Sequence, residues 1–140
     1  GICLGDHRTT RNIFARKAFT VSMADAENVV AADYVGIVSG DKVPDKLAKT
    51  GWHITKSEFV DAPLIDELPM ALECEFLSYD ENTGLLLGRI VNVCAEERIL
   101  TDGRIDLTKF RPITYDPSGH GYYTLGEKVG NAFCDGKALK

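Results

Sequence analysis

The chain lacks the features by which several large protein classes are recognised. Its longest uncharged apolar stretches, such as residues 85–88, are far too short to span a bilayer, and no basic segment followed by an apolar one stands at its start. Its sixteen Lys and Arg residues form no long run, and the net charge is −5. This composition argues against a membrane and against nucleic acid as the main partner.

Cysteine-based metal sites and glycine-rich nucleotide fingerprints are missing as well. The four cysteines form no CxxC pair, and the glycines within 36–40 and 126–130 do not follow the GxGxxG spacing. The sequence also shows no catalytic triad. We therefore predict no metal site and identify no catalytic residue. All four cysteines are interpreted as thiols in a reducing cytoplasm, with the last the most exposed: Cys3, Cys74, Cys94 and Cys134.

What is present is enough sequence for one domain with a core, since 44% of the 140 residues are apolar. Two long segments with strand-like alternation, 70–79 and 85–95, flank a loop ending in Gly84, which predicts a β-hairpin. In the second strand, strict alternation places Leu87, Arg89, Val91 and Val93 on one face. That strand is apolar on both faces in places, which is typical of a barrel wall that also touches a helix or another subunit.

Shorter segments complete the prediction. We expect a strand end at 2–4, a short helix capped by Thr9 or Thr10, and a strand at 19–23. A second helix begins at Asp25 and ends at Gly36, a short helix covers 44–49, and a strand covers 53–60. Strands outnumber helices, and consecutive strands pair by hairpins. The pattern favours a mainly β fold, an antiparallel barrel with peripheral helices.

A turn-rich segment near the C-terminal end carries two adjacent tyrosines. Asp116-Pro117 and the glycines at 119 and 121 break regular structure, so we expect Tyr122 and Tyr123 to emerge from a turn. Aromatic rings on a rigid turn suit contact with a flat ligand or a partner chain, and a Tyr that only covers the core is the alternative. His120, in the same loop, is interpreted as solvated.

Five ordered segments together resemble the flavin reductase-like family, which includes the flavoredoxins. They are Arg8-Thr9-Thr10-Arg11-Asn12-Ile13 followed by Phe19-Thr20-Val21-Ser22; Asp33-Tyr34-Val35-Gly36 with Ser39-Gly40 and Asp45-Lys46-Leu47; Pro69-Met70-Ala71-Leu72-Glu73-Cys74; Gly88-Arg89-Ile90-Val91-Asn92-Val93; and Tyr115-Asp116-Pro117 with Tyr122-Tyr123-Thr124-Leu125-Gly126-Glu127. The resemblance spans nearly the whole chain.

The resemblance implies a single FMN-binding split-barrel domain over residues 1–140. Family members carry about two further strands before the position of Gly1, so the resemblance also implies that this domain lacks its first strands. It also implies non-covalent FMN, a homodimer, and electron transfer from NAD(P)H or a protein donor to flavin, ferric iron or a protein acceptor. An NAD(P)H-dependent flavin reductase-like oxidoreductase and an electron carrier with a redox protein partner both fit. A non-enzymatic small barrel that binds a partner or a non-flavin ligand is the alternative.

The resemblance and the chemistry of FMN together select the candidate site residues. The flavin phosphate needs cations and N–H donors, which a helix start at Arg8, Thr9, Thr10 and Asn12 supplies. A second group for the phosphate or the ribityl chain is Ser39, Gly40 and Lys46. Tyr122 and Tyr123 are candidates for the wall of the flavin ring or for the dimer contact. Solvated polar residues at these positions are the alternative, and Trp52 is interpreted as core or interface.

Overall fold

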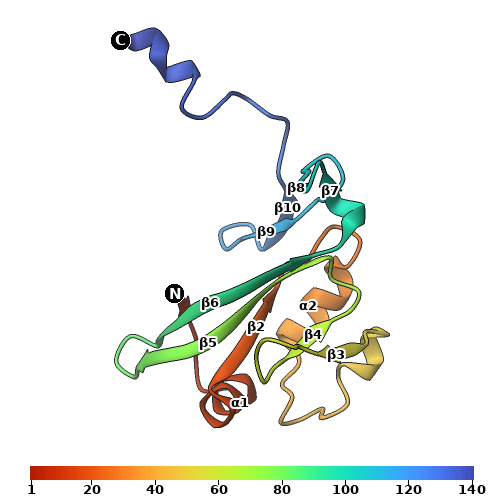
Figure 1. Ribbon diagram of the computed structural model, residues 1–140. Coiled ribbons are helices and arrows are strands. Elements are labelled where there is room, and N and C mark those ends of the chain that lie inside the picture. The colour runs from red at the N-terminus through yellow and green to blue at the C-terminus, as the bar shows by residue number, and fades with distance from the viewer.

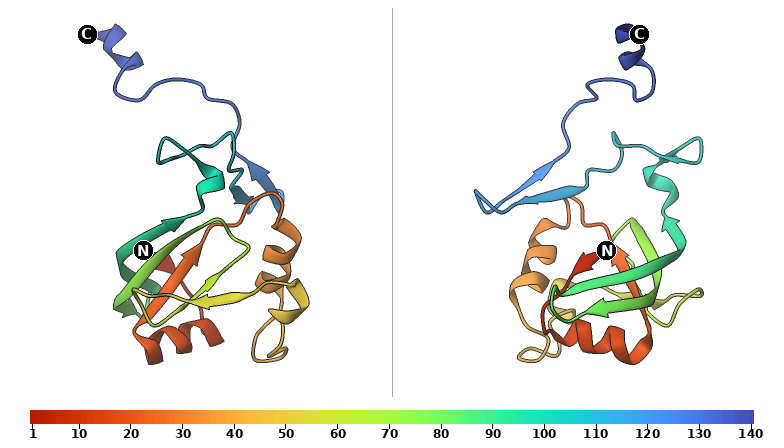
Figure 2. Two further views of the ribbon diagram at one scale, coloured as in Figure 1. Left: turned by 45° about the vertical axis from the view of Figure 1, so that its right-hand side comes forward. Right: turned by 90° about the vertical axis from the view of Figure 1, so that its left-hand side faces the viewer.

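The computed structural model describes residues 1–140 and is built around one antiparallel sheet (Figure 1). Its strands are β1 (Ile2–Cys3), β2 (Ala18–Ser22), β5 (Met70–Asp80) and β6 (Leu85–Ala95), in the order β1-β6-β5-β2. The sheet curls into a half-barrel, with two α-helices at its periphery (Figures 1 and 2). The predicted mainly β fold and the predicted hairpin of two long strands are both confirmed.

The hairpin turn depends on Gly84. Its φ angle is +68°, a left-handed conformation that side chains with a Cβ rarely adopt, and a Cβ built there would lie 2.8 Å from the carbonyl oxygen of Leu4. The Gly84 carbonyl accepts a hydrogen bond of 2.8 Å from the Leu4 N–H. The turn therefore also fixes the chain that leads from β1 to the first helix.

Two irregularities in the β5–β6 pairing change which residues share a face. The register shifts between Glu73 and Cys74, so that Cys74 pairs with Ile90 but Glu73 pairs with Asn92. Val91 is thus an extra residue in a β-bulge, and Val93 pairs with Leu72 on the face opposite to Arg89. The prediction that Leu87, Arg89, Val91 and Val93 share one face is wrong, because it assumed unbroken alternation.

The main core lies on the inner face of the curled sheet. Ile13 from helix α1 (Arg8–Arg16) packs there with three buried residues of the sheet: Phe19, Cys74 and Leu86. Gly88 leaves room for the Phe19 ring, since a Cβ at Gly88 would lie 2.4 Å from Phe19 Cζ. The predicted cap of this helix is wrong. The cap position is His7, and Thr10 is buried inside the first turn, where its hydroxyl donates to the Gly5 carbonyl at 2.7 Å.

A second hairpin, β3 (Ile54–Lys56) with β4 (Pro63–Ile65), lies against the other side of β2. Between its strands the Ser57 hydroxyl accepts hydrogen bonds from the N–H groups of Phe59 and Val60, so the chain turns there and the strand predicted over 53–60 is shorter. Glu73 of β5 is only 2% exposed and accepts hydrogen bonds from Ser57 and from Asn92. These bonds attach the second hairpin to the sheet.

The remaining helices differ from the prediction in extent. Helix α2 (Val29–Ile37) begins four residues after Asp25, because the Asp25 carboxylate accepts two bonds from Asn28 and holds a turn before the helix. The short helix predicted over 44–49 is a series of turns followed by η1 (Ala48–Thr50), which ends at Gly51 with φ +74°. None of the helices is long and apolar enough to cross a membrane.

The last third of the chain leaves the sheet. It contains η2 (Glu97–Ile99), the pair β7 (Leu100–Thr101) and β8 (Arg104–Ile105), the pair β9 (Ile113–Asp116) and β10 (Gly121–Thr124), and η3 (Asp135–Leu139). Tyr122 and Tyr123 lie in β10, so the prediction that they emerge from a turn and not from a regular element is wrong. Asp116-Pro117 and Gly119 form the end of β9 and the turn that follows it, and the tyrosines pair with Tyr115 and Thr114 of β9. All four cysteines are free thiols, and Cys134 is exposed as predicted.

Candidate functional site

The start of α1 and the loop after α2 come together, which joins two groups that the sequence analysis kept separate. Arg8 donates from Nη1 to the Gly40 carbonyl at 2.8 Å, and its Cδ would lie 3.3 Å from a Cβ at Gly40. Lys46 reaches the same loop and donates from Nζ to the carbonyls of Val35 and Val38 at 2.7 and 2.8 Å. We call Arg8, Ser39, Gly40 and Lys46 the anchor cluster.

The three cationic side chains near this loop, Arg8, Arg11 and Lys46, have different hydrogen-bond partners. Arg11 donates to Asp41 at 2.6 Å and to Asp6 at 2.9 Å, and its guanidinium lowers the pKa of the Asp41 carboxyl. Arg8 and Lys46 instead donate to neutral backbone carbonyls and form no ion pair. Although the charge of Arg8 also acts on Asp41, neither cation is paired directly with a carboxylate, which makes them the cations suited to an anionic ligand.

A cleft of about 850 Å³ runs beside α1, and we call it the α1 cleft. Thr9, Asn12 and Arg16 line it from one face of the helix, because residues three and four apart lie on the same side. Facing them are Thr20 of β2 and residues of the second hairpin. The apolar part of this wall is Ile54, Ala62 and Pro63. The cleft thus combines hydroxyl and amide groups on one side with an apolar surface on the other.

Asp61 organises the charges of the α1 cleft. Its carboxylate lies 3.0 Å from Arg16 Nη1 and 3.4 Å from Lys56 Nζ, and these bonds lower the pKa of Asp61. Two cations and one anion leave a single positive charge at this end. The sequence analysis missed Arg16, Lys56 and Asp61. The helical spacing of Arg16 from Thr9 and Asn12 was a usable signal, whereas nothing local connects Lys56 or Asp61 to α1.

The structure divides the predicted site residues into four groups, of which the tyrosines are the last. Arg8, Ser39, Gly40 and Lys46 form the anchor cluster, and Thr9 and Asn12 line the neighbouring α1 cleft. Thr10 points into the protein and is only 4% exposed, so its predicted contact with a phosphate does not fit this structure.

The two tyrosines lie elsewhere. The Tyr122 hydroxyl donates to Asp33 of α2 at 2.8 Å, which raises the pKa of Tyr122, and its ring lies 5.5 Å from that of Tyr115. Tyr123 is exposed, and neither tyrosine lines the α1 cleft. The hydroxyl bond instead ties the β9–β10 hairpin to α2. The structure does not bring the tyrosines together with the other predicted residues.

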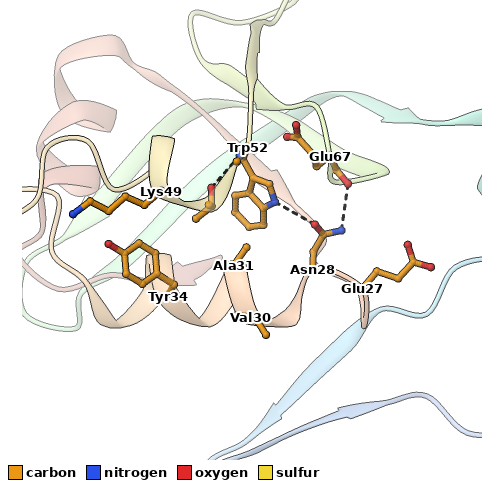
Figure 3. A pocket seen from close by; sticks show the side chains of 10 residues that line it. Glu27, Asn28, Val30, Ala31, Tyr34, Lys49, Trp52 and Glu67 are labelled. Carbon is orange, nitrogen blue, oxygen red and sulfur yellow. Dashed lines mark hydrogen bonds between the residues drawn. The ribbon is translucent and has the colours of Figure 1, made fainter.

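A second cavity, of about 580 Å³, lies between α2 and η1 (Figure 3). Trp52 forms its wall, donates from Nε1 to Asn28 at 3.1 Å and is only 7% exposed, in line with its interpretation as a core residue. Tyr34 and Lys49 lie at one end, and Glu27 and Glu67 at the other (Figure 3). Glu67 also binds His53 at 2.7 Å and raises the pKa of that imidazole. With more carboxylates than cations, this cavity is less suited to a phosphate than the anchor cluster.

Comparison with known proteins places these features in context. Residues 1–104 match the family described as flavin reductase like domain. A flavoredoxin of Desulfovibrio vulgaris (Miyazaki F) is 37% identical, with a TM-score of 0.89 over 95% of this chain and 72% of that one. A flavoredoxin from Methanosarcina acetivorans is 28% identical, with a TM-score of 0.87 over 99% of this chain and 74% of that one.

A third similar structure extends the likeness at lower identity. It is an FMN-binding domain of a flavin reductases-like enzyme from Shewanella baltica OS155, 17% identical, with a TM-score of 0.82 over 93% of this chain and 72% of that one. At this identity the likeness concerns the fold alone. The three structures together confirm the predicted antiparallel split-barrel fold with peripheral helices.

Proposed function

The chain belongs to the flavin reductase-like domain family, and from this premise we propose that it binds FMN non-covalently and passes electrons through it. The observation that carries the proposal is the anchor cluster beside the α1 cleft. Arg8 and Lys46 have no carboxylate within ion-pair distance. Arg8 directly precedes Thr9, which lines the cavity of about 850 Å³, while no residue of the anchor cluster lines it. A volume in this range holds a ligand of cofactor size.

Three sets of residues correspond to the three parts of FMN: the anchor cluster, the polar face of α1, and the apolar wall opposite α1. Arg8, Lys46 and the backbone of the 39–40 loop would hold the phosphate by charge-assisted hydrogen bonds. Thr9 and Asn12 would bind the ribityl hydroxyls, and the apolar wall of the α1 cleft would hold the ring. When bound, FMN supplies the redox chemistry itself. The chain's part is to orient the ring and to fix the charge around it.

We further propose a homodimer in the cytoplasm that takes electrons from NAD(P)H or from a redox protein. The free thiols favour a reducing compartment. The α1 cleft holds no histidine, and its one carboxylate, Asp61, is paired with Arg16 and Lys56, so the site offers no obvious general acid. A transfer between two cofactors needs orientation more than proton transfer, and this site is built for orientation.

The experiment that tests FMN binding is a visible absorption spectrum of the purified protein, before and after addition of FMN and gel filtration. We expect an oxidised-flavin band that co-elutes with the protein. A protein that stays colourless after addition of FMN would contradict the proposal. It would favour the alternative, a barrel that binds a partner or a non-flavin ligand.

A second measurement separates reductase from carrier. The holoprotein is mixed with NADH or NADPH without oxygen, and the flavin band is followed. Bleaching by either nucleotide identifies a reductase, and reduction only by a low-potential protein donor identifies a carrier. Free FMN with the same nucleotide is the control.

A further inference from the structure

Glu73 of β5 is a buried carboxylate that the proposed function has not used. Its residue is only 2% exposed, and none of the ion pairs of the protein includes it. Glutamate is almost never fully buried without a cationic partner, because taking a charge out of water costs free energy. Charged groups in such surroundings concentrate at functional sites, where they act on a neighbouring group.

Hydrogen bonds take the place of a cation and keep Glu73 ionised. Its carboxylate accepts from the Ser57 hydroxyl, and from the side-chain amide of Asn92 at 2.8 Å. Burial raises the pKa of Glu73, but the bonds from Ser57, Asn92 and Cys94 outweigh burial and leave the pKa lowered. Glu73 is therefore negatively charged at neutral pH, in surroundings that screen a charge less than water does.

The carboxylate of Glu73 lies directly behind the wall of the α1 cleft. Glu73 pairs in register with Thr20 of β2, so the two side chains point to the same face of the sheet, one strand spacing of about 5 Å apart. Thr20 lines the cleft. Ser57, which binds Glu73, also donates its N–H to the carbonyl of Ala62 at 3.0 Å, and Ala62 belongs to the apolar wall. The buried charge is thus one strand away from the proposed place of the flavin ring.

We propose that Glu73 lowers the reduction potential of the bound flavin, an inference that rests on the binding of FMN in the α1 cleft proposed above. Two-electron reduction of FMN with uptake of one proton adds one negative charge to the ring, and a fixed anion behind the wall repels that charge. NAD(P)H supplies the electrons and the proton together as a hydride. With a protein donor of electrons, the proton comes from the solvent. Glu73 acts only through its charge and exchanges no proton.

The other charges of the α1 cleft act differently, because water reaches them. The side chains of Arg16 and Lys56 are 66% and 76% exposed, and both pair with Asp61. Together these three residues leave one positive charge, which favours reduced flavin but is screened by salt. Glu73 opposes that charge from a place that water does not reach. Its effect on the potential should therefore persist at high salt, whereas the effect of the exposed charges should fade.

The test compares wild-type holoprotein with Glu73→Gln, which removes the charge and keeps the size of the side chain. If the Asn92 amide turns by half a turn, the glutamine still bonds to both Ser57 and Asn92. The matched control is Glu75→Gln, the same change two residues along β5 at an exposed position. Fluorescence quenching gives the dissociation constant of oxidised FMN. Anaerobic reduction against a reference dye gives the potential, and hence the dissociation constant of reduced FMN.

We expect Glu73→Gln to raise the affinity for reduced FMN relative to oxidised FMN by about tenfold, which is a rise in potential of about 30 mV for a two-electron couple. Glu75→Gln should leave this ratio of affinities unchanged. The difference between the two variants should remain at about 1 M NaCl. A loosened cleft would weaken the binding of both forms alike, so the ratio separates the charge of Glu73 from its part in attaching the second hairpin.

An unchanged ratio in Glu73→Gln overturns the inference, and so does an equal rise in Glu75→Gln. A second variant, Asn92→Lys, leaves Glu73 in place and supplies the missing cation beside it. It should raise the ratio in the same direction, and it decides the question if Glu73→Gln does not fold. No rise in Asn92→Lys would then overturn the inference. A wild-type protein without a flavin band contradicts the proposed function itself, and that result is read before any potential is measured.

Discussion

Arg8 and Arg11 stand three residues apart on α1 and have different roles. Arg11 is held between Asp6 and Asp41, whereas Arg8 donates to a neutral carbonyl of Gly40. If Arg8 holds the flavin phosphate, Arg8→Ala should weaken FMN binding by about 1.5–3 kcal/mol, the range for a hydrogen bond to a charged group. Quenching of FMN fluorescence during titration measures the affinity.

The matched control for this substitution is Arg104→Ala, which removes an exposed arginine of β8 far along the chain. Its affinity for FMN should equal that of the wild type. Equal affinities for Arg8→Ala and Arg104→Ala would remove Arg8 from the site, and Lys46 would then be the cation to test.

The lowered pKa of Asp106 makes the free energy of unfolding depend on pH. Its carboxylate accepts hydrogen bonds from the hydroxyls of Thr101 and Thr108, both at 2.6 Å, and these lower its pKa from 3.8 to about 2. A carboxyl whose folded pKa lies below its unfolded pKa stabilises the fold above the unfolded value. This contribution is lost as the pH falls from about 4 through the folded pKa of about 2.

The substitution Asp106→Asn should therefore lower the free energy of unfolding at pH 7. It should also flatten the decline in stability between about pH 4 and pH 2. Urea denaturation at several pH values measures both effects. An Asp106→Asn protein with the same decline as the wild type would show that other carboxylates carry the acid sensitivity.

At the scale of elements, the contact between β2 and β6 depends on one glycine. A Cβ at Gly88 would lie 2.4 Å from Phe19 Cζ and 3.2 Å from the Glu75 carbonyl oxygen, so both a buried ring and a backbone would have to move. We expect Gly88→Ala to destabilise the protein by about 1–3 kcal/mol, the usual cost of overpacking a core. The midpoint of urea denaturation measures it.

Gly36 provides the matched control. It lies in α2, and nothing stands within 4 Å of the position its Cβ would take. Gly36→Ala should raise stability by about 0.5–1 kcal/mol, because alanine favours a helix. A Gly88→Ala protein as stable as Gly36→Ala would mean that Phe19 does not lie against β6.

Elements with a strong local pattern were predictable from the sequence, and those set by side-chain bonds were not. The long hairpin follows from alternation and from Gly84 in its turn. The start of α2 depends on Asp25 bonding to Asn28, and the short β3 depends on Ser57 bonding to the turn that follows it. Periodicity does not report such bonds, because each competes locally with regular structure.

At the scale of the whole molecule, the candidate site shows the same division. The cations at Arg8 and Lys46 were selected separately from the sequence, but their meeting through the 39–40 loop is a tertiary contact. The opposite wall of the α1 cleft comes from residues 54–63, whose place beside α1 depends on the packing of Ala18 against Val60 and Ala62. Tyr122 was attractive as an isolated motif, yet its hydroxyl is engaged by Asp33.

FMN bound between α1 and the second hairpin would add contacts between two segments that already meet through the ion pair of Arg16 with Asp61. A ligand that binds only the folded state stabilises it by mass action, by about 2.7 kcal/mol at a hundred times its dissociation constant. We therefore expect FMN to raise the midpoint of urea denaturation of the whole domain. Riboflavin, which has the same ring and ribityl chain but no phosphate, is the matched control. At equal concentration it should stabilise the protein less, because Arg8 and Lys46 would have no anion to bind. Equal stabilisation by FMN and riboflavin would mean that the anchor cluster does not hold the phosphate, even if the α1 cleft holds the ring.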